Sequence, residues 1–297
     1  KSAMAANTTG SRNLAIGVEA YDASDTENDN IAIGFQAMTT NTAGGTGNVA
    51  VGNYALDALT SGDYNVAIGH VALGGNTTAD ANVAVGYAAL LANTTGASNI
   101  AMGRQALTTN ITGSNNTAIG HVALGDNTAS DNTAFGYLAA NATTTGANNV
   151  AVGSSALAAN TTGASNTIIG RNAGMTATTV SGNTAVGDNA LKINVAEYNT
   201  AVGAFAMDTN TTGTTCTAVG YAALDANSTG SHNTGIGAYA LVANTTGAAN
   251  VALGKGAGAG ITTGSRNIAI GYNTYDASDT ENDNIAIGYQ AMTTNTA

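Results

Sequence analysis

A five-residue pattern, Asn-x-Ala-Φ-Gly with Φ an apolar residue, recurs along the whole chain. The gaps between successive copies are 17 residues, apart from one of 18 and two of 16. Such a period without long insertions predicts a solenoid, because each repeat can bury its apolar face only by stacking on its neighbours. We expect one continuous array of about 17 repeats over residues 1–297. The copies begin at Asn13, Asn30, Asn48, Asn65, Asn82, Asn99, Asn116, Asn132, Asn149, Asn166, Asn183, Asn199, Cys216, Asn233, Asn250, Asn267 and Asn284.

Within each copy the residue types indicate strands and turns. Val, Ile, Leu or Thr follows the first position, and a second apolar residue precedes the invariant Gly. β-Branched residues favour strands, and Gly tolerates the left-handed or close-packed backbone that would end one. Asn-Thr-Thr-Gly, as in 93–96 and 160–163, is typical of a turn. Each repeat is therefore predicted to be a strand, a turn, a short second strand at Ala-Leu and another turn. A helical repeat is disfavoured by the poor helix propensity of these residues.

The fold class that follows is all-β: a parallel β-solenoid of 17-residue coils. In the strand, the first and third residues point to one side and the central Ala to the other. We expect the large β-branched residues to face the core and the Ala-rich face to pack against another copy. The Asn residues are expected to stack into ladders, each amide bonding the next. Representative structural residues are Asn65, Gly69, Asn82, Gly86, Asn99, Gly103, Asn116 and Gly120.

Composition excludes several classes of function. The chain has 18 acidic and 7 basic residues, a net charge of −11. Nucleic-acid binding needs a cationic surface, so we expect no nucleic-acid partner. No apolar run is long enough for a membrane-spanning helix, so we expect no membrane insertion in this segment. One cysteine, Cys216, rules out an internal disulfide framework.

A longer repeat overlies the short one. Residues 1–43 match residues 255–297 at 34 of 43 positions, and the segment 21–34 returns unchanged as 275–288. The simplest account of this duplication is that the chain is a window of a longer repetitive fibre.

The motif resembles the head repeat of YadA-like trimeric autotransporter adhesins, as in residues 116–123. The longer unit that runs over residues 149–163 is similar to arrays in phage and bacterial tail-fibre-domain proteins. The resemblance implies a homotrimeric fibre of left-handed parallel β-rolls, displayed on a cell surface or virion. The adhesin head repeat is shorter than 17 residues, so the details of its trimer face do not transfer directly.

The position after the invariant Gly collects aromatic and basic residues. A ridge of such side chains could bind glycans or a receptor, since Tyr and Arg dominate binding hot spots. The alternative is that this position is only the roomiest outward corner or a subunit contact. The residues are Phe35, His70, Tyr87, Arg104, His121, Tyr137, Arg171, Tyr221, Lys255, Tyr272 and Tyr289.

The densest charge lies in one acidic segment and its duplicate. Closely spaced carboxylates can hold a hard cation, so calcium is a possible cofactor; the alternative is a solvated acidic loop. No other cofactor is expected. The acidic residues are Asp22, Asp25, Glu27, Asp29, Asp276, Asp279, Glu281 and Asp283.

Two functions are compatible with these features. The first is an extracellular structural and adhesive fibre segment, whose partners are other copies of itself and a host-cell surface, extracellular matrix or glycan. The alternative is a solenoid that binds ice or another surface lattice. Adjacent Thr-Thr pairs disfavour that alternative, because neighbouring strand residues face opposite sides. Enzymatic activity is not expected, because uniform coils without loop insertions leave no wall for a cleft.

Overall fold

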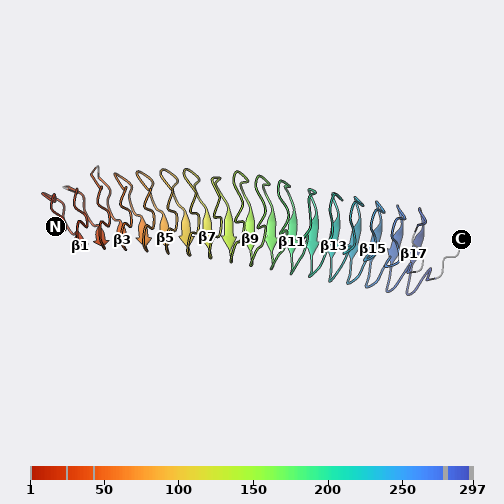
Figure 1. Cartoon of the computed structure of the whole chain (residues 1–297). Helices are drawn as coiled ribbons and strands as arrows, with labels where there is room; N and C mark the ends of the chain where they lie inside the picture. The colour runs from red at the N-terminus through yellow and green to blue at the C-terminus, as the bar shows by residue number, and fades with distance from the viewer. Residues whose placement is uncertain (1, 25, 43, 277–279, 294–297) are drawn as a thin grey trace. The chain divides into compact units, whose positions relative to one another are not determined.

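A computed structural model describes residues 2–24, 26–42, 44–276 and 280–293. In these ranges the regular structure is entirely β: seventeen three-residue strands and no helix. The chain divides into two compact units, unit 1 (Lys1–Asn148) and unit 2 (Asn149–Ala297). Each unit is a parallel β-solenoid with one strand in each coil, which confirms the predicted fold class (Figure 1).

Unit 1 contains eight of the described strands, each paired in parallel with the next at equivalent positions of the repeat. For example, Val66, Ala67 and Ile68 lie opposite Val83, Ala84 and Val85. The strands are β1 (Leu14–Ile16), β2 (Ile31–Ile33), β3 (Val49–Val51), β4 (Val66–Ile68), β5 (Val83–Val85), β6 (Ile100–Met102), β7 (Thr117–Ile119) and β8 (Thr133–Phe135).

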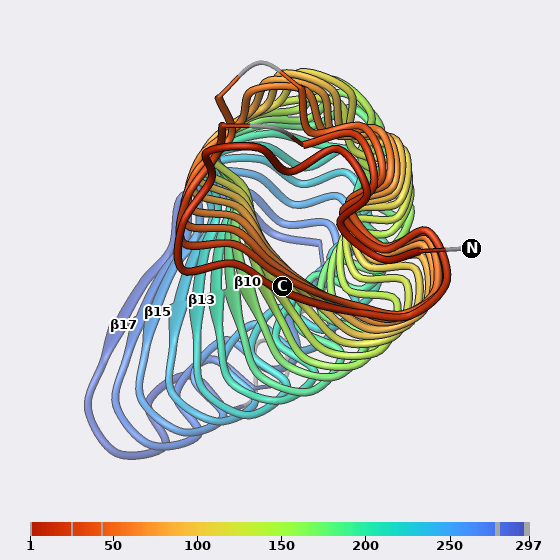
Figure 2. The same cartoon turned by 90° about the vertical axis from the view of Figure 1, so that its left-hand side faces the viewer.

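Unit 2 contains the other nine described strands and repeats the same parallel, in-register pairing. In the view turned by 90° from Figure 1, the labelled strands of unit 2 follow one another along the same side of their coils (Figure 2). They are β9 (Val150–Val152), β10 (Thr167–Ile169), β11 (Thr184–Val186), β12 (Thr200–Val202), β13 (Thr217–Val219), β14 (Thr234–Ile236), β15 (Val251–Leu253), β16 (Ile268–Ile270) and β17 (Ile285–Ile287).

The prediction of which strand face lies inside the solenoid is wrong. The central alanines, such as Ala67 and Ala101, are fully buried, whereas the flanking large residues lie outside, with Ile68 and Met102 each 41% exposed. The interior is narrow: a Cβ added to Gly235, which replaces the central Ala in β14, would already lie 3.3 Å from Leu224 Cγ. Only a small side chain fits between the strand and the leucines that face it. The Ile and Val residues therefore form the outer face, and the Ala face forms the core.

The predicted second strand is also absent from the described coils. The Ala-Leu segment is a turn in which left-handed residues alternate with others, as at Val71 (φ 51°) and Leu73 (φ 51°). This alternation prevents a strand, because a strand needs successive residues in the extended conformation and each left-handed residue turns the backbone away from it. The side chains of Ala72 and Leu73 still reach the core, where both are fully buried.

The invariant Gly is required twice over. Gly69 has a φ of +140°, a conformation that only glycine adopts readily, and a Cβ at this position would lie 2.4 Å from the carbonyl oxygen of Gly86 in the next coil. The strands end here because the backbones of successive coils come too close for any side chain.

The predicted Asn ladder is confirmed. The side-chain oxygen of Asn48 accepts a hydrogen bond from the backbone N–H of Asn65 at 2.8 Å and another from its side-chain amide at 3.1 Å. The Asn65 amide also donates to the carbonyl of Ala79 at 2.8 Å. These residues are fully buried. The ladder thus satisfies buried polar groups that would otherwise cost about 1–3 kcal/mol each.

Candidate functional site

Six ridge side chains of unit 1, together with Tyr54, form a continuous ladder from coil to coil. Ring centroids are separated by 5.3 Å from Phe35 to Tyr54, 5.9 Å from Tyr54 to His70 and 5.7 Å from His70 to Tyr87. The Arg104 guanidinium lies 5.7 Å from the centroid of the Tyr87 ring. The ladder continues from Arg104 to His121, where the two nitrogens are 2.9 Å apart, and from His121 to Tyr137, with centroids at 5.5 Å.

Unit 2 carries shorter ladders of the same kind. Tyr221 lies between Phe205 at 5.9 Å and Tyr239 at 5.3 Å. Tyr272 stacks on Tyr289 at 5.7 Å. Lys255 extends this second ladder, with its Nζ 5.7 Å from the Tyr272 centroid. The structure therefore brings most of the predicted ridge residues together as neighbours.

Sequence reasoning missed three members of these ladders. Tyr54, Phe205 and Tyr239 occupy the position one residue later than the other ridge residues. Each has a left-handed backbone, with φ between 59° and 61°, and its ring still contacts the neighbouring ridge side chain. The available signal was the small or polar residue at the usual position, Asn53 in one case, followed directly by an aromatic residue.

Some neighbouring rings of the ladders stack face to face. His70 and Tyr87 are nearly parallel, with an interplanar angle of 8°, as are His121 and Tyr137 at 12°. Such contacts stabilise the stacking of coils by about 0.5–1.5 kcal/mol for each pair. A ligand alongside the ladder meets mainly ring edges, hydroxyl groups and the Arg104 guanidinium. Hydrogen bonding and charge are therefore the contacts that the ladder offers.

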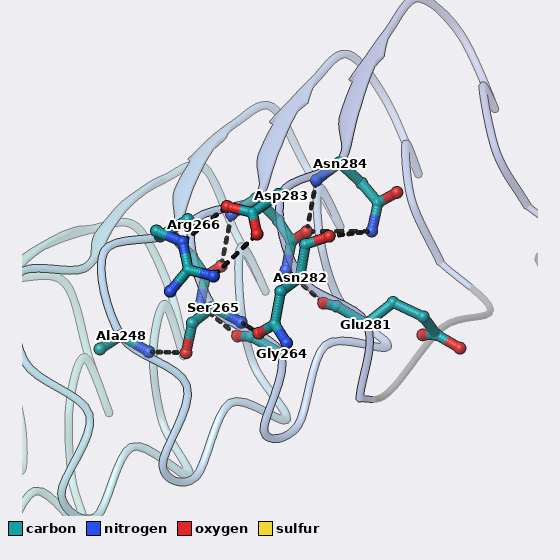
Figure 3. Close-up of polar contacts among 10 residues, drawn as sticks. Ala248, Gly264, Ser265, Arg266, Glu281, Asn282, Asp283 and Asn284 are labelled. Carbon is teal, nitrogen blue, oxygen red and sulfur yellow. Dashed lines mark hydrogen bonds and ion pairs between the residues drawn. The ribbon is translucent and has the colours of Figure 1, made fainter.

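Several carboxylates of the two acidic segments accept hydrogen bonds from other residues of the chain. Asp29 accepts a hydrogen bond from Arg12 at 2.7 Å, which lowers the pKa of its carboxyl group. Asp283 and Arg266 repeat this pair in the duplicate segment, also at 2.7 Å and with a lowered pKa for Asp283 (Figure 3). The nearly buried Glu27 accepts a hydrogen bond from the backbone N–H of Gly44 at 3.1 Å.

The carboxylates of these segments are not gathered into a metal site. Asp22 accepts a hydrogen bond from the backbone N–H of Ala5 at 3.3 Å, Asp276 is exposed, and the Glu281 side chain points away from Asp283 in Figure 3. Asp25 and Asp279 lie outside the described residues. Among the residues that the structure describes, no three His, Cys, Asp or Glu side chains are grouped so as to hold a metal ion. Calcium binding remains a prediction.

The outer face of the strands is a second candidate surface. In β2–β6 both outward positions of every strand are Ile, Val or Met, so the face is wholly apolar there. In β10–β14 the first outward position is Thr instead and the second stays Ile or Val. A continuous apolar surface strip is a candidate site for the binding of another molecule.

The remaining reactive groups are not assembled into a site. Cys216 is buried, and burial raises the pKa of its thiol, so it is unreactive. The described surface contains no pocket. No helix in the described ranges could cross a membrane. No protein-family model matches the sequence, and a comparison with curated proteins finds no relative.

Proposed function

We propose that this chain is a structural and adhesive segment of an extracellular fibre on a cell surface or virion, in which three copies associate through the outer faces of their strands. The observation that supports this most is the apolar outer face of β2–β6. Water contact with Ile, Val and Met in five successive strands is unfavourable by roughly 25 cal/mol for each Å² that stays exposed. Association of copies removes that surface from water.

The regularity of the coils supports a structural role. Every described coil donates and accepts backbone hydrogen bonds with its neighbours, as from Gly69 to the carbonyl of Val51 at 2.8 Å. Stability is then a sum over neighbouring coils, which allows a fibre to be lengthened by adding repeats. Repetition also favours adhesion, because many weak contacts on one fibre raise the effective concentration of the binding surface.

Disulfide trapping tests the association directly. In a chain with Cys216 replaced by serine, Ile68→Cys places one thiol on the outer face of β4, and mild oxidation should link chains through it. Thr95→Cys, at an exposed turn position of a neighbouring coil, is the matched control and should give few linked chains. Equal linkage by the two variants would contradict an interface at the strand face.

A second function, binding to ice or another lattice, is favoured by one observation. The Thr residues of β10–β14 point outward in register, and no described residue forms a hydrogen bond with their hydroxyl groups. The adjacent threonines of the turns are different, because their hydroxyls donate to the next coil, as from Thr94 to the carbonyl of Ile111 at 3.1 Å. The strand threonines are Thr167, Thr184, Thr200, Thr217 and Thr234.

Thermal hysteresis separates the two functions. A lattice-binding solenoid should depress the freezing point without changing the melting point, and Thr200→Lys should abolish the difference by disrupting the array. The fibre proposal predicts no hysteresis, because association covers the same face.

A further inference from the structure

Three of the four arginines are neutralised by an aspartate at the equivalent position of the next coil. Arg12 donates to Asp29 and Arg266 to Asp283, each at 2.7 Å, and Arg171 donates to Asp188 at 2.8 Å. Figure 3 shows the Arg266 guanidinium facing the Asp283 carboxylate. In an acidic protein, this pairing leaves each of these arginines with little attraction for a further anion.

Arg104 is the exception. The equivalent residue of the next coil is His121, and Arg104 Nη1 lies 2.9 Å from His121 Nε2. A guanidinium has no acceptor, so Nη1 donates and Nε2 accepts. None of the ion pairs in the described ranges involves Arg104. The guanidinium therefore keeps its full charge in an exposed position.

The neighbouring side chains hold Arg104 in place. Its guanidinium lies over the Tyr87 ring on one side and is bonded to His121 on the other, and His121 stacks in turn on Tyr137. One edge of the guanidinium, Nε and Nη2, has no partner among the described residues and can bind a carboxylate with two parallel hydrogen bonds. Because its neighbours already fix it, less side-chain entropy is lost when a ligand binds.

The surroundings favour a sugar as the carrier of that carboxylate. Tyr87 and Tyr137 are 50% and 53% exposed. Tyr87 contacts Arg104 directly, and Tyr137 lies on the far side of His121. The Tyr87 ring lies between His70 and Arg104, and one face of the Tyr137 ring stacks on His121. The described surface has no pocket for an apolar peptide side chain. The ligand that complements this surface best carries many hydroxyl groups for hydrogen bonding and one acidic group for Arg104.

We propose that Arg104, held between Tyr87 and His121, binds the carboxylate of an acidic sugar in a glycan. The site rests on the proposed adhesive function, because it names the class of ligand that the fibre contacts. It differs in its charge from the other arginine of the ridge, Arg171, which is neutralised by Asp188.

Titration of the full chain with trigalacturonate tests the site, with the neutral sugar maltotriose as the reference. Trigalacturonate should bind and maltotriose should bind at least tenfold more weakly. Arg104→Gln should weaken trigalacturonate binding about tenfold or more, the range expected when a charge-assisted hydrogen bond is lost. Arg171→Gln is the matched control and should leave binding unchanged.

His121→Asp provides a second variant that keeps the coil intact. It recreates the pairing seen between Arg171 and Asp188, so it should neutralise Arg104 and weaken binding as much as Arg104→Gln does. An unchanged unfolding midpoint, or a higher one, shows that the variant is folded. Binding that survives both variants, equal binding of maltotriose, or tighter binding of hexaglutamate than of trigalacturonate would overturn the proposal.

The outcome is distinguishable from a failure of the fibre proposal. Arg104 lies on the ladder and not on an outward position of a strand, so Arg104→Gln should leave the molar mass of the assembly unchanged. A monomeric protein that still loses trigalacturonate binding in Arg104→Gln would refute the assembly alone. A trimer that binds no trigalacturonate would refute the sugar site alone.

Discussion

Ile168 fills the space that a leucine occupies in most other coils. It replaces the central Ala of β10, and Gly174 stands in the same coil at the usual Leu position. A Cβ on Gly174 would lie 3.3 Å from Ile168 Cγ2 and 3.4 Å from its Cδ1. The two exceptions to the pattern therefore compensate each other, and the volume of the core is conserved.

This compensation predicts strong coupling between the two positions. Ile168→Ala alone should destabilise the protein by about 2–5 kcal/mol, because a buried aliphatic side chain leaves a cavity. Gly174→Leu alone should overpack the coil at a cost of about 1–3 kcal/mol. The double variant restores the common Ala and Leu pair, so it should be more stable than the sum of the single changes by about 2 kcal/mol or more. Urea unfolding of all four proteins measures the coupling, and additive effects would contradict the shared cavity.

The invariant glycines allow the backbone clash to be separated from the conformational cost. Gly69→Ala suffers both, because its Cβ would meet the Gly86 carbonyl oxygen at 2.4 Å and its φ is +140°. Gly288→Ala has a similar φ of +130°, but among the described residues its Cβ would meet only the Ala291 Cβ at 4.0 Å. We expect Gly69→Ala to destabilise the protein by about 3 kcal/mol or more and Gly288→Ala by clearly less. Thermal unfolding compares them, and equal losses would show that the clash is relieved at little cost.

Cys216 interrupts the Asn ladder. Its backbone N–H donates to the side-chain oxygen of Asn199 at 2.9 Å, but its own side chain carries a sulfur in place of an amide, with Sγ 3.3 Å from the Gly230 carbonyl. Cys216→Asn should supply the missing amide and stabilise the protein by about 1 kcal/mol. Cys216→Ala, which supplies neither group, is the control. A Cys216→Asn variant less stable than the natural chain would show that the site has adapted to sulfur.

Two aspartates of unit 2 give a pH dependence of known sign. Burial raises the pKa of Asp225 from its ordinary value of 3.8, and the nearby charge of Asp208 raises it further. Burial likewise raises the pKa of Asp208. A carboxyl group with a higher pKa in the folded state binds its proton more tightly there, so its charged form opposes folding. The penalty is present above the folded pKa and is relieved as the pH falls toward 3.8.

Asp225→Asn should therefore stabilise the protein at pH 7 and remove part of the stability gained on acidification. Asp29→Asn should act in the opposite direction, since Arg12 lowers the pKa of Asp29 and its contribution to stability is lost as the pH falls through that lowered value. Unfolding midpoints at pH 7 and pH 4.5 measure the change at Asp225, and midpoints at pH 7 and at a pH below 3.8, the ordinary pKa, measure the change at Asp29. A destabilised Asp225→Asn variant at pH 7 would contradict the direction of the shift.

Much of the architecture could be predicted from the sequence because the period fixes it. Strand positions, parallel register and the Asn ladder all follow from a fixed motif at a nearly fixed spacing. Alternation alone could not predict which strand face is buried, because both faces are apolar. The larger side chains suggested the face that in fact lies outside. The substitution of Ile168 together with Gly174 was the available signal, because only facing core positions need to exchange volume.

The ladder of aromatic and basic side chains could be predicted only in part, because its members come from two positions of the repeat. A column of the repeat identified Tyr87 and Tyr137, but Tyr54 joins the ladder from the next position through its left-handed backbone. Pairwise distances were needed to show that Arg104 lacks the carboxylate partner that the other arginines have. The sequence columns do place an aspartate one period after each of the other arginines and His121 after Arg104, but only the structure shows that these side chains are bonded.

The molar mass in solution, measured by light scattering after size exclusion, tests the central claim most directly. Association through the outer strand faces predicts a mass near three times the 28.9 kDa of one chain, reduced by Val85→Lys on β5 and unchanged by Thr95→Lys at an exposed turn. A mass near 28.9 kDa for the natural chain would contradict the claim and show that the apolar strand face stays uncovered by other copies.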